Sequence, residues 1–178
     1  YSSFNQSIDS WDVSSVTQMQ FMFFNADYNQ PLNSWDVSNV QFMANVFQSS
    51  MFNQPINSWD VSNVTNMSEM FRFSSFNQPL NNWDVSNVTG NGFEGMFSNS
   101  DFNQDISSWE FSESDLDDFI KNSEMDSNNY DLLLGRFVQL GLQDGYLDAD
   151  NIEYCDIFTR ETLIDDLNWD IFDDELGN

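Results

Sequence analysis

The sequence predicts a repeat solenoid that is closed by a helix-containing C-terminal cap. Two observations predict this fold class: a short motif recurs at a nearly fixed interval through residues 1–121, and helical patterns replace it in residues 122–178. A motif that recurs at intervals of 20 to 50 residues is typical of proteins whose neighbouring units stack. We therefore expect an α/β solenoid of short parallel strands and short helices, followed by the cap.

The repeat is defined by two sequence motifs. One is Trp-Asp-Val-Ser, which recurs at intervals of 24, 24, 24 and 26 residues if the degenerate last copy is included. Its copies begin at Trp11, Trp35, Trp59, Trp83 and Trp109. The other is an aromatic residue followed by Asn and Gln, which begins at Phe4, Tyr28, Phe52, Phe76 and Phe102. Five copies of each motif predict five solenoid turns. The turns are expected to stack on one another, because one unit of this length cannot bury both of its faces alone.

Each unit contains two different hydrophobic periods. Around Trp35 and Val37 the apolar spacing is like the L-x-x-L-x-L pattern of leucine-rich repeats, which predicts a short strand with Asp36 facing outward. Further on, Met67, Met70 and Phe71 have the i, i+3, i+4 spacing of one helical face. A unit is thus predicted to form a strand, a short helix and a return loop.

Asparagine follows the aromatic residue in every unit, at Asn29, Asn53, Asn77 and Asn103 among others. An amide in this position can bond the backbone of the adjacent unit and form an asparagine ladder. Such a ladder needs no ligand, and the recurrence of Asn therefore indicates a scaffold role.

The acidic residues of the tetrapeptide are candidate binding residues. Stacking would place them in a column with neighbours about 4.8 Å apart. The column consists of Asp12, Asp36, Asp60, Asp84 and Glu110. Each Asp can accept hydrogen bonds from the following Ser-Asn turn. Alternatively, calcium or a basic partner bridges the column, because hard cations take carboxylate oxygens.

A second candidate binding surface is a glycine-bearing bulge at Gly90, Asn91 and Gly92, where the fourth unit has two extra residues. Insertions in repeat proteins map to loops, which often lie on a binding face. A neutral insertion is the alternative. Asp144, Asp148 and Asp150 also cluster, but the D-x-[DN]-x-[DN]-G calcium loop is missing, so no metal-ligating set is predicted there.

Composition excludes several functions. The net charge of −26 would repel the phosphates of nucleic acids and anionic membrane surfaces. Histidine is absent and Cys155 is the one cysteine, which removes zinc sites, internal disulfides and His-based catalysis. Since no run of eighteen apolar residues occurs, no membrane insertion is expected. No catalytic residues are predicted, and any signal peptide is expected to lie outside this sequence.

One family resemblance covers nearly the whole chain. Residues 52–71, Phe-Asn-Gln-Pro-Ile-Asn-Ser-Trp-Asp-Val-Ser-Asn-Val-Thr-Asn-Met-Ser-Glu-Met-Phe, resemble the bacterial surface-protein 26-residue repeat of BspA-like, leucine-rich-repeat-like proteins. The segments 127–134 and 154–165 are similar to the region that closes such arrays. The resemblance implies a secreted or surface-displayed protein with adhesion or partner binding as its usual role. It implies no catalytic residue.

Residues 122–178 are also expected to cap the stack on physical grounds. Ser114 with Asp117 suggests a capped helical turn, and Thr159 is the expected N-cap of a helix that runs to Leu167. The expected face of an earlier helix consists of Leu132, Leu133, Phe137 and Leu140. Cys155 is expected to be a small buried hydrophobe rather than a reactive thiol.

Two functional hypotheses follow. The first is a non-catalytic extracellular or cell-surface module for adhesion, in which the Asp, Ser and Asn face or the glycine-bearing bulge contacts a protein or a glycan. The second is a structural stalk or filament subunit that self-associates through its solenoid ends, with calcium as a candidate aid. Neither hypothesis involves nucleic acid.

Overall fold

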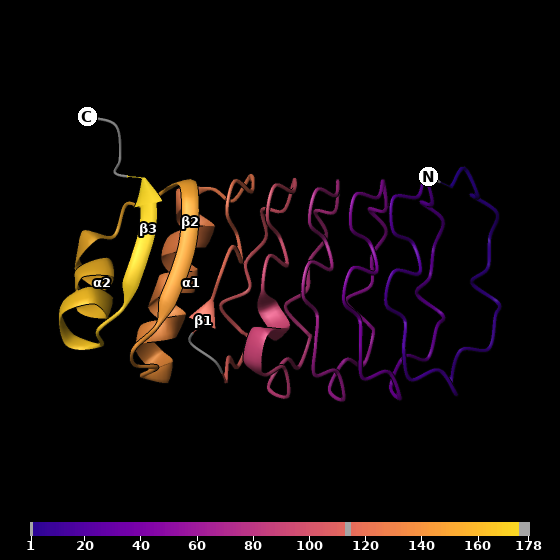
Figure 1. Cartoon of the computed structure of the whole chain (residues 1–178), viewed down its shortest axis with the longest axis horizontal. Helices are drawn as coiled ribbons and strands as arrows, with labels where there is room; N and C mark the ends of the chain where they lie inside the picture. The colour runs from indigo at the N-terminus through magenta and orange to yellow at the C-terminus, as the bar shows by residue number, and fades with distance from the viewer. Residues whose placement is uncertain (1, 113–114, 175–178) are drawn as a thin grey trace.

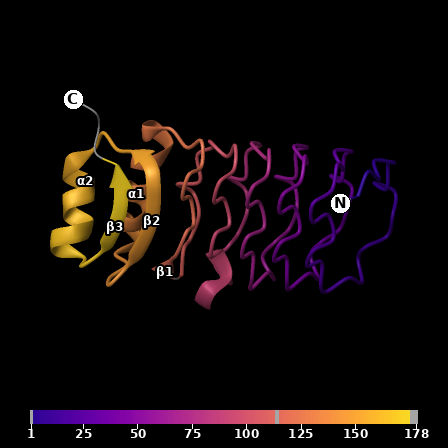
Figure 2. The same ribbon diagram turned by 45° about the horizontal axis from the view of Figure 1, so that its top comes forward.

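The computed structural model describes residues 2–112 and 115–174. Figures 1 and 2 show the chain as a row of coils that lie side by side along the long axis, with the N-terminus at one end and the helices α1 and α2 at the other. We call the coils unit 1 (residues 4–27), unit 2 (28–51), unit 3 (52–75), unit 4 (76–101) and unit 5 (102–125).

One segment of each unit carries the backbone hydrogen bonds that join it to the next. In unit 2, the amides of Met43, Asn45, Phe47 and Ser49 donate to carbonyls of unit 3 over 2.8–2.9 Å. The amides of Val46 and Gln48 instead close local four-residue turns, as when Gln48 N donates to the Asn45 carbonyl. We call the segments 17–25, 41–49, 65–73 and 91–99 the wall. Every second amide of the wall therefore bonds a neighbouring unit.

The short helices expected within the units are not formed. Between residues 2 and 112 the one helical element is the 3-10 helix η1, Gly90–Phe93. Met67, Met70 and Phe71 are nevertheless fully buried, so the i, i+3, i+4 spacing identified the core residues correctly. Positive φ angles, as at Asn45 (60°) and Ser49 (56°), interrupt any helix and turn alternate amides toward the next unit.

The strand expected around Trp35 is also absent from residues 2–112, where parallel pairing is limited to isolated bridges such as Gln18 with Phe42. The bridges of Gln18 with Phe42 and of Phe42 with Asn66 lie in the wall, a third joins Ser2 to Ala26, and none lies in the tetrapeptide. The predicted side-chain directions are confirmed, because Trp35 and Val37 are buried and Asp36 is exposed. The tetrapeptide joins neighbouring units through side chains instead of a backbone ladder.

The predicted asparagine ladder is confirmed. The Oδ1 atom of Asn53 accepts from the backbone amide of Asn77 over 2.9 Å and from Gln78 Nε2 over 3.0 Å. The same pair of bonds joins Asn29 to Asn53 and Gln54. The ladder continues into the cap, where Asn103 Oδ1 accepts from other amides. Each unit thus holds its successor through one amide side chain.

A tryptophan ladder and stacked aromatic rings fill the interior. The indole Nε1 of Trp59 donates to the carbonyl of Leu32 in the preceding unit over 3.0 Å, and Trp83 repeats this bond to Ile56 over 3.1 Å. Phe52 and Phe76 stack at 6.2 Å with their planes 1° apart. Because each ring contacts its counterpart in the next unit, the core is continuous along the stack.

The cap continues the wall with regular strands. Its parallel sheet has the order β1 (Asp115–Leu116), β2 (Tyr146–Glu153) and β3 (Asp170–Asp174). Backbone bonds from Gly95 to Asp117 and from Phe97 to Phe119 join unit 4 to the segment that contains β1. The cap even retains the indole bond, since Trp169 Nε1 donates to the Leu142 carbonyl over 2.8 Å.

Helices pack behind this sheet (Figures 1 and 2). They are α1 (Ser127–Leu140), α2 (Ile157–Glu161) and the π-helical turn η2 (Thr162–Asp166) that continues α2. Tyr130 of α1 and Arg160 of α2 both bond Asp173 of β3. Burial raises the pKa of Tyr130 well above its ordinary value, so this phenol donates to the carboxylate.

Several details of the cap differ from expectation. Asp156 and not Thr159 is the N-cap of α2, because its carboxylate accepts the Thr159 amide. Leu133 and Phe137 of α1 are buried, whereas Leu132 is exposed. Cys155 is exposed and not buried; it lies in the short loop before α2, where the Cys155 and Asp156 amides donate to Asp131. The expected cap at Ser114 lies outside the described residues.

We predict that Asn53→Ala lowers the free energy of unfolding by about 1–3 kcal/mol, because the amide of Asn77 would lose its acceptor. Urea denaturation followed by tryptophan fluorescence measures this change. Asn33→Ala is the matched control: Asn33 is exposed, and its loss should change stability by less than about 0.5 kcal/mol. Equal effects of the two substitutions would contradict the ladder's role.

Candidate binding surfaces

The predicted acid column is held by local hydrogen bonds. Asp36 Oδ1 accepts from the Ser38 amide over 3.1 Å and from the Ser38 hydroxyl over 2.6 Å. The same two bonds recur between Asp60 and Ser62 with equal lengths. Asp12 and Asp84 have the corresponding serine partners. The expected Asx-type turn is therefore confirmed for the four aspartates, all of which are exposed.

In Asp12, Asp36 and Asp84 these bonds stabilise the charged form of the carboxylate. The hydroxyl of Ser38, followed by its backbone amide, lowers the pKa of Asp36, and the neighbouring charge of Asp12 opposes the shift. Ser14 and Ser86 lower the pKa of Asp12 and Asp84 in the same way. A carboxylate with a lowered pKa stays ionised at neutral pH without a cation.

Glu110, the fifth member of the column, has a different environment. It pairs with Arg136 of α1, whose Nε also donates to the carbonyl of Trp109 over 2.8 Å. A shallow depression between units 4 and 5 contains Asp84, Ser86 and Glu110. The column therefore ends in an ion pair with the cap rather than in another Asx turn.

The glycine-bearing bulge forms η1, which projects from the edge of unit 4 (Figure 2). Gly90 and Asn91 are exposed, and Gly90 has a φ of +57°. Gly92 is buried, and a β-carbon there would lie 2.8 Å from the carbonyl oxygen of Thr65. Close packing against unit 3 therefore explains Gly92, and two of the three predicted bulge residues face solvent.

Ion pairs cross the wall toward the C-terminal end. Arg72 of unit 3 bonds Glu69 over 2.7 Å and lies 4.0 Å from Asp118 of unit 5. Lys121 Nζ lies 3.4 Å from Asp118, 2.8 Å from Asp148 and 3.3 Å from Asp150. Hydrogen bonding to Asp148 raises the pKa of Lys121, which therefore stays charged.

The three acids that cluster in the sequence at Asp144, Asp148 and Asp150 have different partners in the structure. Asp148 and Asp150 contact Lys121, whereas Asp144 accepts from Asn168 Nδ2 over 2.6 Å. Carboxylate oxygens of Asp117, Asp118 and Asp148 do approach within 4.8 Å of one another. Because the ammonium of Lys121 already lies between Asp118 and Asp148, the cluster is an ion-pair network.

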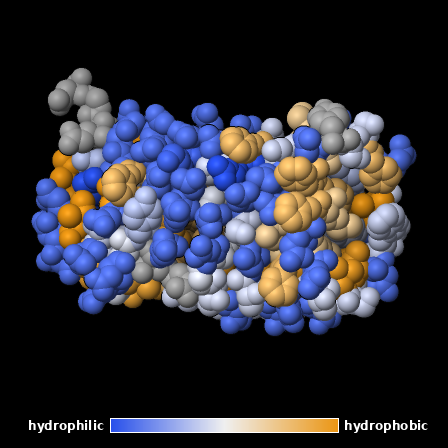
Figure 3. All heavy atoms as spheres, viewed as in Figure 1, coloured by the Kyte–Doolittle hydropathy of each residue, from blue (hydrophilic) through white to orange (hydrophobic). Residues whose placement is uncertain are grey.

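The N-terminal part of the same wall is hydrophobic. Figure 3 shows orange side chains gathered over the first units, while blue side chains cover most of the face toward the cap. Phe21 and Phe24 are 58% and 46% exposed, and their rings meet edge to face at 5.9 Å. We call these two rings the wall aromatic pair.

Phe21 has an unfavourable backbone conformation as well as an exposed ring. Its φ is 61°, in the left-handed region that bulky residues avoid at a cost of about 1 kcal/mol or more. The counterparts of Phe21 in units 2, 3 and 4 are Asn45, Glu69 and Gly95. Phe73 is a second exposed ring with positive φ, at 56°, but Arg72 lies over it at 5.2 Å.

Sequence reasoning did not find the wall aromatic pair. Phe21 and Phe24 lie beside Met22 and Phe23 in an unbroken apolar run, which resembles a core segment. The sequence nevertheless contains a signal: Phe21 is aromatic, whereas the equivalent positions of the next three units are Asn45, Glu69 and Gly95. Alignment of the units by period would have separated the exposed positions from the buried ones.

We predict that Ser38→Ala raises the pKa of Asp36 toward its ordinary value, because the hydroxyl bond is the largest cause of the lowered pKa. Since the folded-state pKa is lowered, the bond contributes to stability at neutral pH and is lost as the pH falls through that pKa. NMR titration of the carboxyl carbons measures the change. Ser58→Ala is the control, and an unchanged Asp36 pKa in Ser38→Ala would contradict the prediction.

We further predict that Gly92→Ala lowers the free energy of unfolding by about 1–3 kcal/mol, since overpacking strains a filled interior. The added β-carbon would meet Val88 Cγ1 at 2.6 Å. Asn91→Ala, at the exposed neighbour, should change stability by less than about 0.5 kcal/mol. Thermal unfolding of both variants provides the comparison, and a Gly92→Ala protein as stable as the parent would refute the packing explanation.

Within the described residues, no helix combines the length and apolar character needed to cross a membrane. No curated protein and no solved structure matches the chain. A family model described as "Mycoplasma protein of unknown function, DUF285" matches residues 1–72 and, in a second overlapping match, residues 29–131. The two matches together span more than half of the chain and coincide with the repeated units. The chain therefore belongs to this repeat-containing family.

Proposed function

We propose that this chain is a non-catalytic extracellular interaction module, a leucine-rich-repeat-like solenoid that binds a protein partner through its wall. The observation that carries the proposal is the wall aromatic pair, in which Phe21 remains exposed at a positive φ. Three other units have Asn, Glu or Gly at this position, so the scaffold does not need the ring. Strain that the fold does not require is typical of functional sites.

The charge distribution specifies the partner further. Residues 1–109 contain 10 acidic and 1 basic residue, whereas residues 110–178 contain 20 acidic and 3 basic residues. The wall segments themselves contain only two acidic residues, Glu69 and Glu94, so most of the acidic charge lies beyond the wall, toward the cap. A protein that presents an apolar protrusion beside lysine or arginine residues complements both the aromatic pair and this charge. Acidic charge accelerates the encounter, and the aromatic pair supplies the desolvated contact.

An adhesion role at the cell surface rests on sequence patterns. The repeat resembles BspA-like surface proteins, and the family match supports the coarser assignment to a repeat-containing family. A net charge of −26 also suits a protein that stays soluble outside the cell. Adhesion to a host-cell or matrix protein is the form of binding that we propose.

We predict that Phe21→Asn combined with Phe24→Asn weakens binding of the labelled chain to cultured epithelial cells by about tenfold or more. Stability should stay at or above that of the parent, because Asn tolerates the left-handed conformation of residue 21. Flow cytometry gives the apparent Kd, and thermal unfolding gives the Tm. Raised salt should weaken binding of the parent, since its acidic charge steers association.

Two controls separate this site from the alternatives. Met51→Gln removes another exposed apolar side chain, from outside the wall segments, and should bind like the parent. Asp36→Asn, Asp60→Asn and Asp84→Asn together remove column charge and keep the acceptor for serine. Loss of binding in this triple variant, with the aromatic variant unaffected, would assign the site to the acid column.

Enzymatic treatment of the cells tests the class of the partner. Binding that survives protease treatment but not glycosidase treatment would replace the protein partner with a glycan.

A further inference from the structure

The N-terminal end of the stack exposes side chains that are buried in every later unit. Phe4, Trp11 and Met22 are 45%, 55% and 41% exposed. Their counterparts in units 2 and 3 are 0–4% exposed. Those counterparts are Tyr28 and Phe52, Trp35 and Trp59, and Val46 and Met70. The apolar surface at this end is therefore one half of an inter-unit interface.

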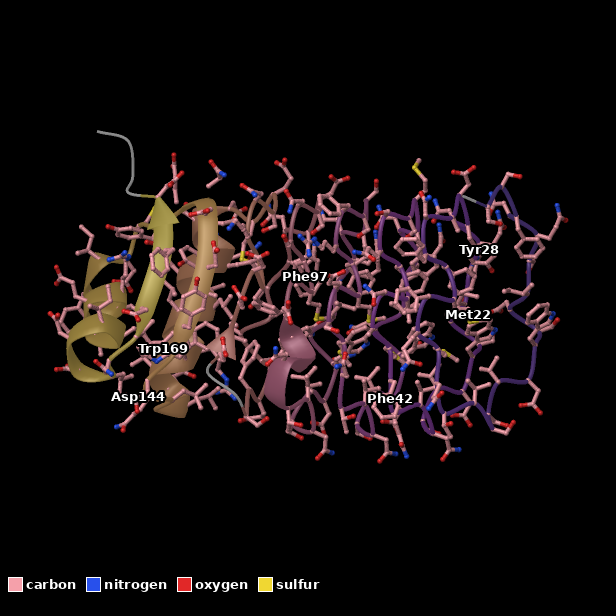
Figure 4. All side chains as sticks on the ribbon, viewed as in Figure 1. Met22, Tyr28, Phe42, Phe97, Asp144 and Trp169 are labelled. Atoms are coloured by element: carbon pink, nitrogen blue, oxygen red, sulfur yellow. The ribbon has the colours of Figure 1, made fainter. Side chains whose placement is uncertain are left out.

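The exposed groups line a single hollow. Phe4, Trp11, Met22 and Phe24 surround it, and Ile8 lies at its base with only 4% exposure. Figure 4 places Met22 and Tyr28 near this end of the stack. Between the later units, the corresponding space is filled by the stacked rings of the preceding unit, as in the 6.4 Å contact of Tyr28 with Phe52.

The backbone carbonyls at this end also correspond to groups that are hydrogen-bonded between the later units. In unit 2, the carbonyls of Phe42, Ala44 and Val46 accept from amides of unit 1. By the 24-residue register, their counterparts in unit 1 are the carbonyls of Gln18, Gln20 and Met22. These acceptors face the end of the stack and fit a segment that presents alternate amides, as each wall segment does.

We propose that this end is a docking surface for one further unit of the same repeat, packed parallel to unit 1. Such a unit supplies rings for Phe4 and Trp11, a row of amide donors for the carbonyls, and an asparagine Oδ1 for the amide of Asn5. Continuity with the existing interfaces carries the proposal, because the same atoms join Asn29 to Asn5 over 2.9 Å. Phe24 lines this hollow and also belongs to the wall aromatic pair, so the two proposed surfaces share that ring, while protection of Trp11 reports on the stack end alone.

A second copy of the chain fits this end less well. Two copies that meet end to end would bring two rows of carbonyl acceptors together, which leaves them without donors. A copy that approaches with its cap would present the exposed ring of Phe158, but beside it Glu161, Asp165 and Asp166, whose carboxylates are costly to bury against Trp11. A parallel unit provides both the donors and the apolar surface.

Tryptophan quenching tests the proposal directly. Of the six tryptophans, Trp11 is 55% exposed and the other five are at most 4% exposed, so acrylamide reaches only Trp11 in the parent chain. A copy of residues 49–72, joined directly before residue 1, preserves the 24-residue register. Phenylalanine replaces the tryptophan of that copy, so that it adds no emission. We expect the quenchable emission to disappear and the Tm to rise by about 5 °C or more.

The control fusion carries the same added residues with its apolar core positions changed to serine, and its Trp11 should stay quenchable. The five buried tryptophans report whether each fusion is folded. If the first fusion does not fold, a copy of residues 25–48 with the same Trp→Phe change keeps the register and repeats the test.

Three results would overturn the proposal. The first is a folded fusion in which Trp11 is quenched as in the parent. The second is equal protection of Trp11 by the serine-substituted control, which would show that chain length alone covers it. The third is protection of Trp11 in the parent itself as concentration rises, together with a doubled mass in light scattering, which would assign the end to a second copy.

Discussion

The rest of the structure depends on one constraint, the parallel backbone pairing of each wall segment with the next. Alternate amides of the wall bond the following unit at 2.8–2.9 Å in unit 2, and this fixes the register between units. Once the register is fixed, identical side chains must meet their counterparts, so asparagine bonds asparagine and ring stacks on ring. A repeat sequence is the economical way to satisfy this condition, because one good contact then recurs along the stack.

The same constraint explains why the two ends differ. At the C-terminal end, β2 and β3 continue the wall, and α1 and α2 take the place of the segments that carry the stacked aromatic rings in the units. Ion pairs such as that of Arg160 with Asp173 fix the helices to the sheet. At the N-terminal end, Trp11 and the carbonyls around Met22 have the form of an interior interface. The C-terminal end is thus richer in acidic side chains and the N-terminal end has the apolar form of an interior interface, so the two ends favour different partners.

Much of the core could be predicted from the sequence, while the secondary structure within the units could not. The periodic spacing identified buried residues such as Trp35, Met67 and Phe71. It assigned a helix where the chain forms local turns, because i, i+3, i+4 spacing reports a shared face and not the path of the backbone. In residues 67–73, every second amide donates a hydrogen bond to a carbonyl of unit 4. A short helix, whose nucleation is costly, therefore has no advantage there.

The sequence by itself determined the period, the asparagine ladder, the Asx turns of Asp12, Asp36, Asp60 and Asp84, and the excess of acid toward the cap. These depend on residue type and spacing, which are local and repeated. Only the tertiary structure decided that Phe21 is exposed while Phe23 is buried, that Cys155 is at the surface, and that Lys121 neutralises Asp148. Each of these outcomes depends on groups brought together by the stacking of units, and the distances between such groups are set by the register of the wall rather than by separation along the chain.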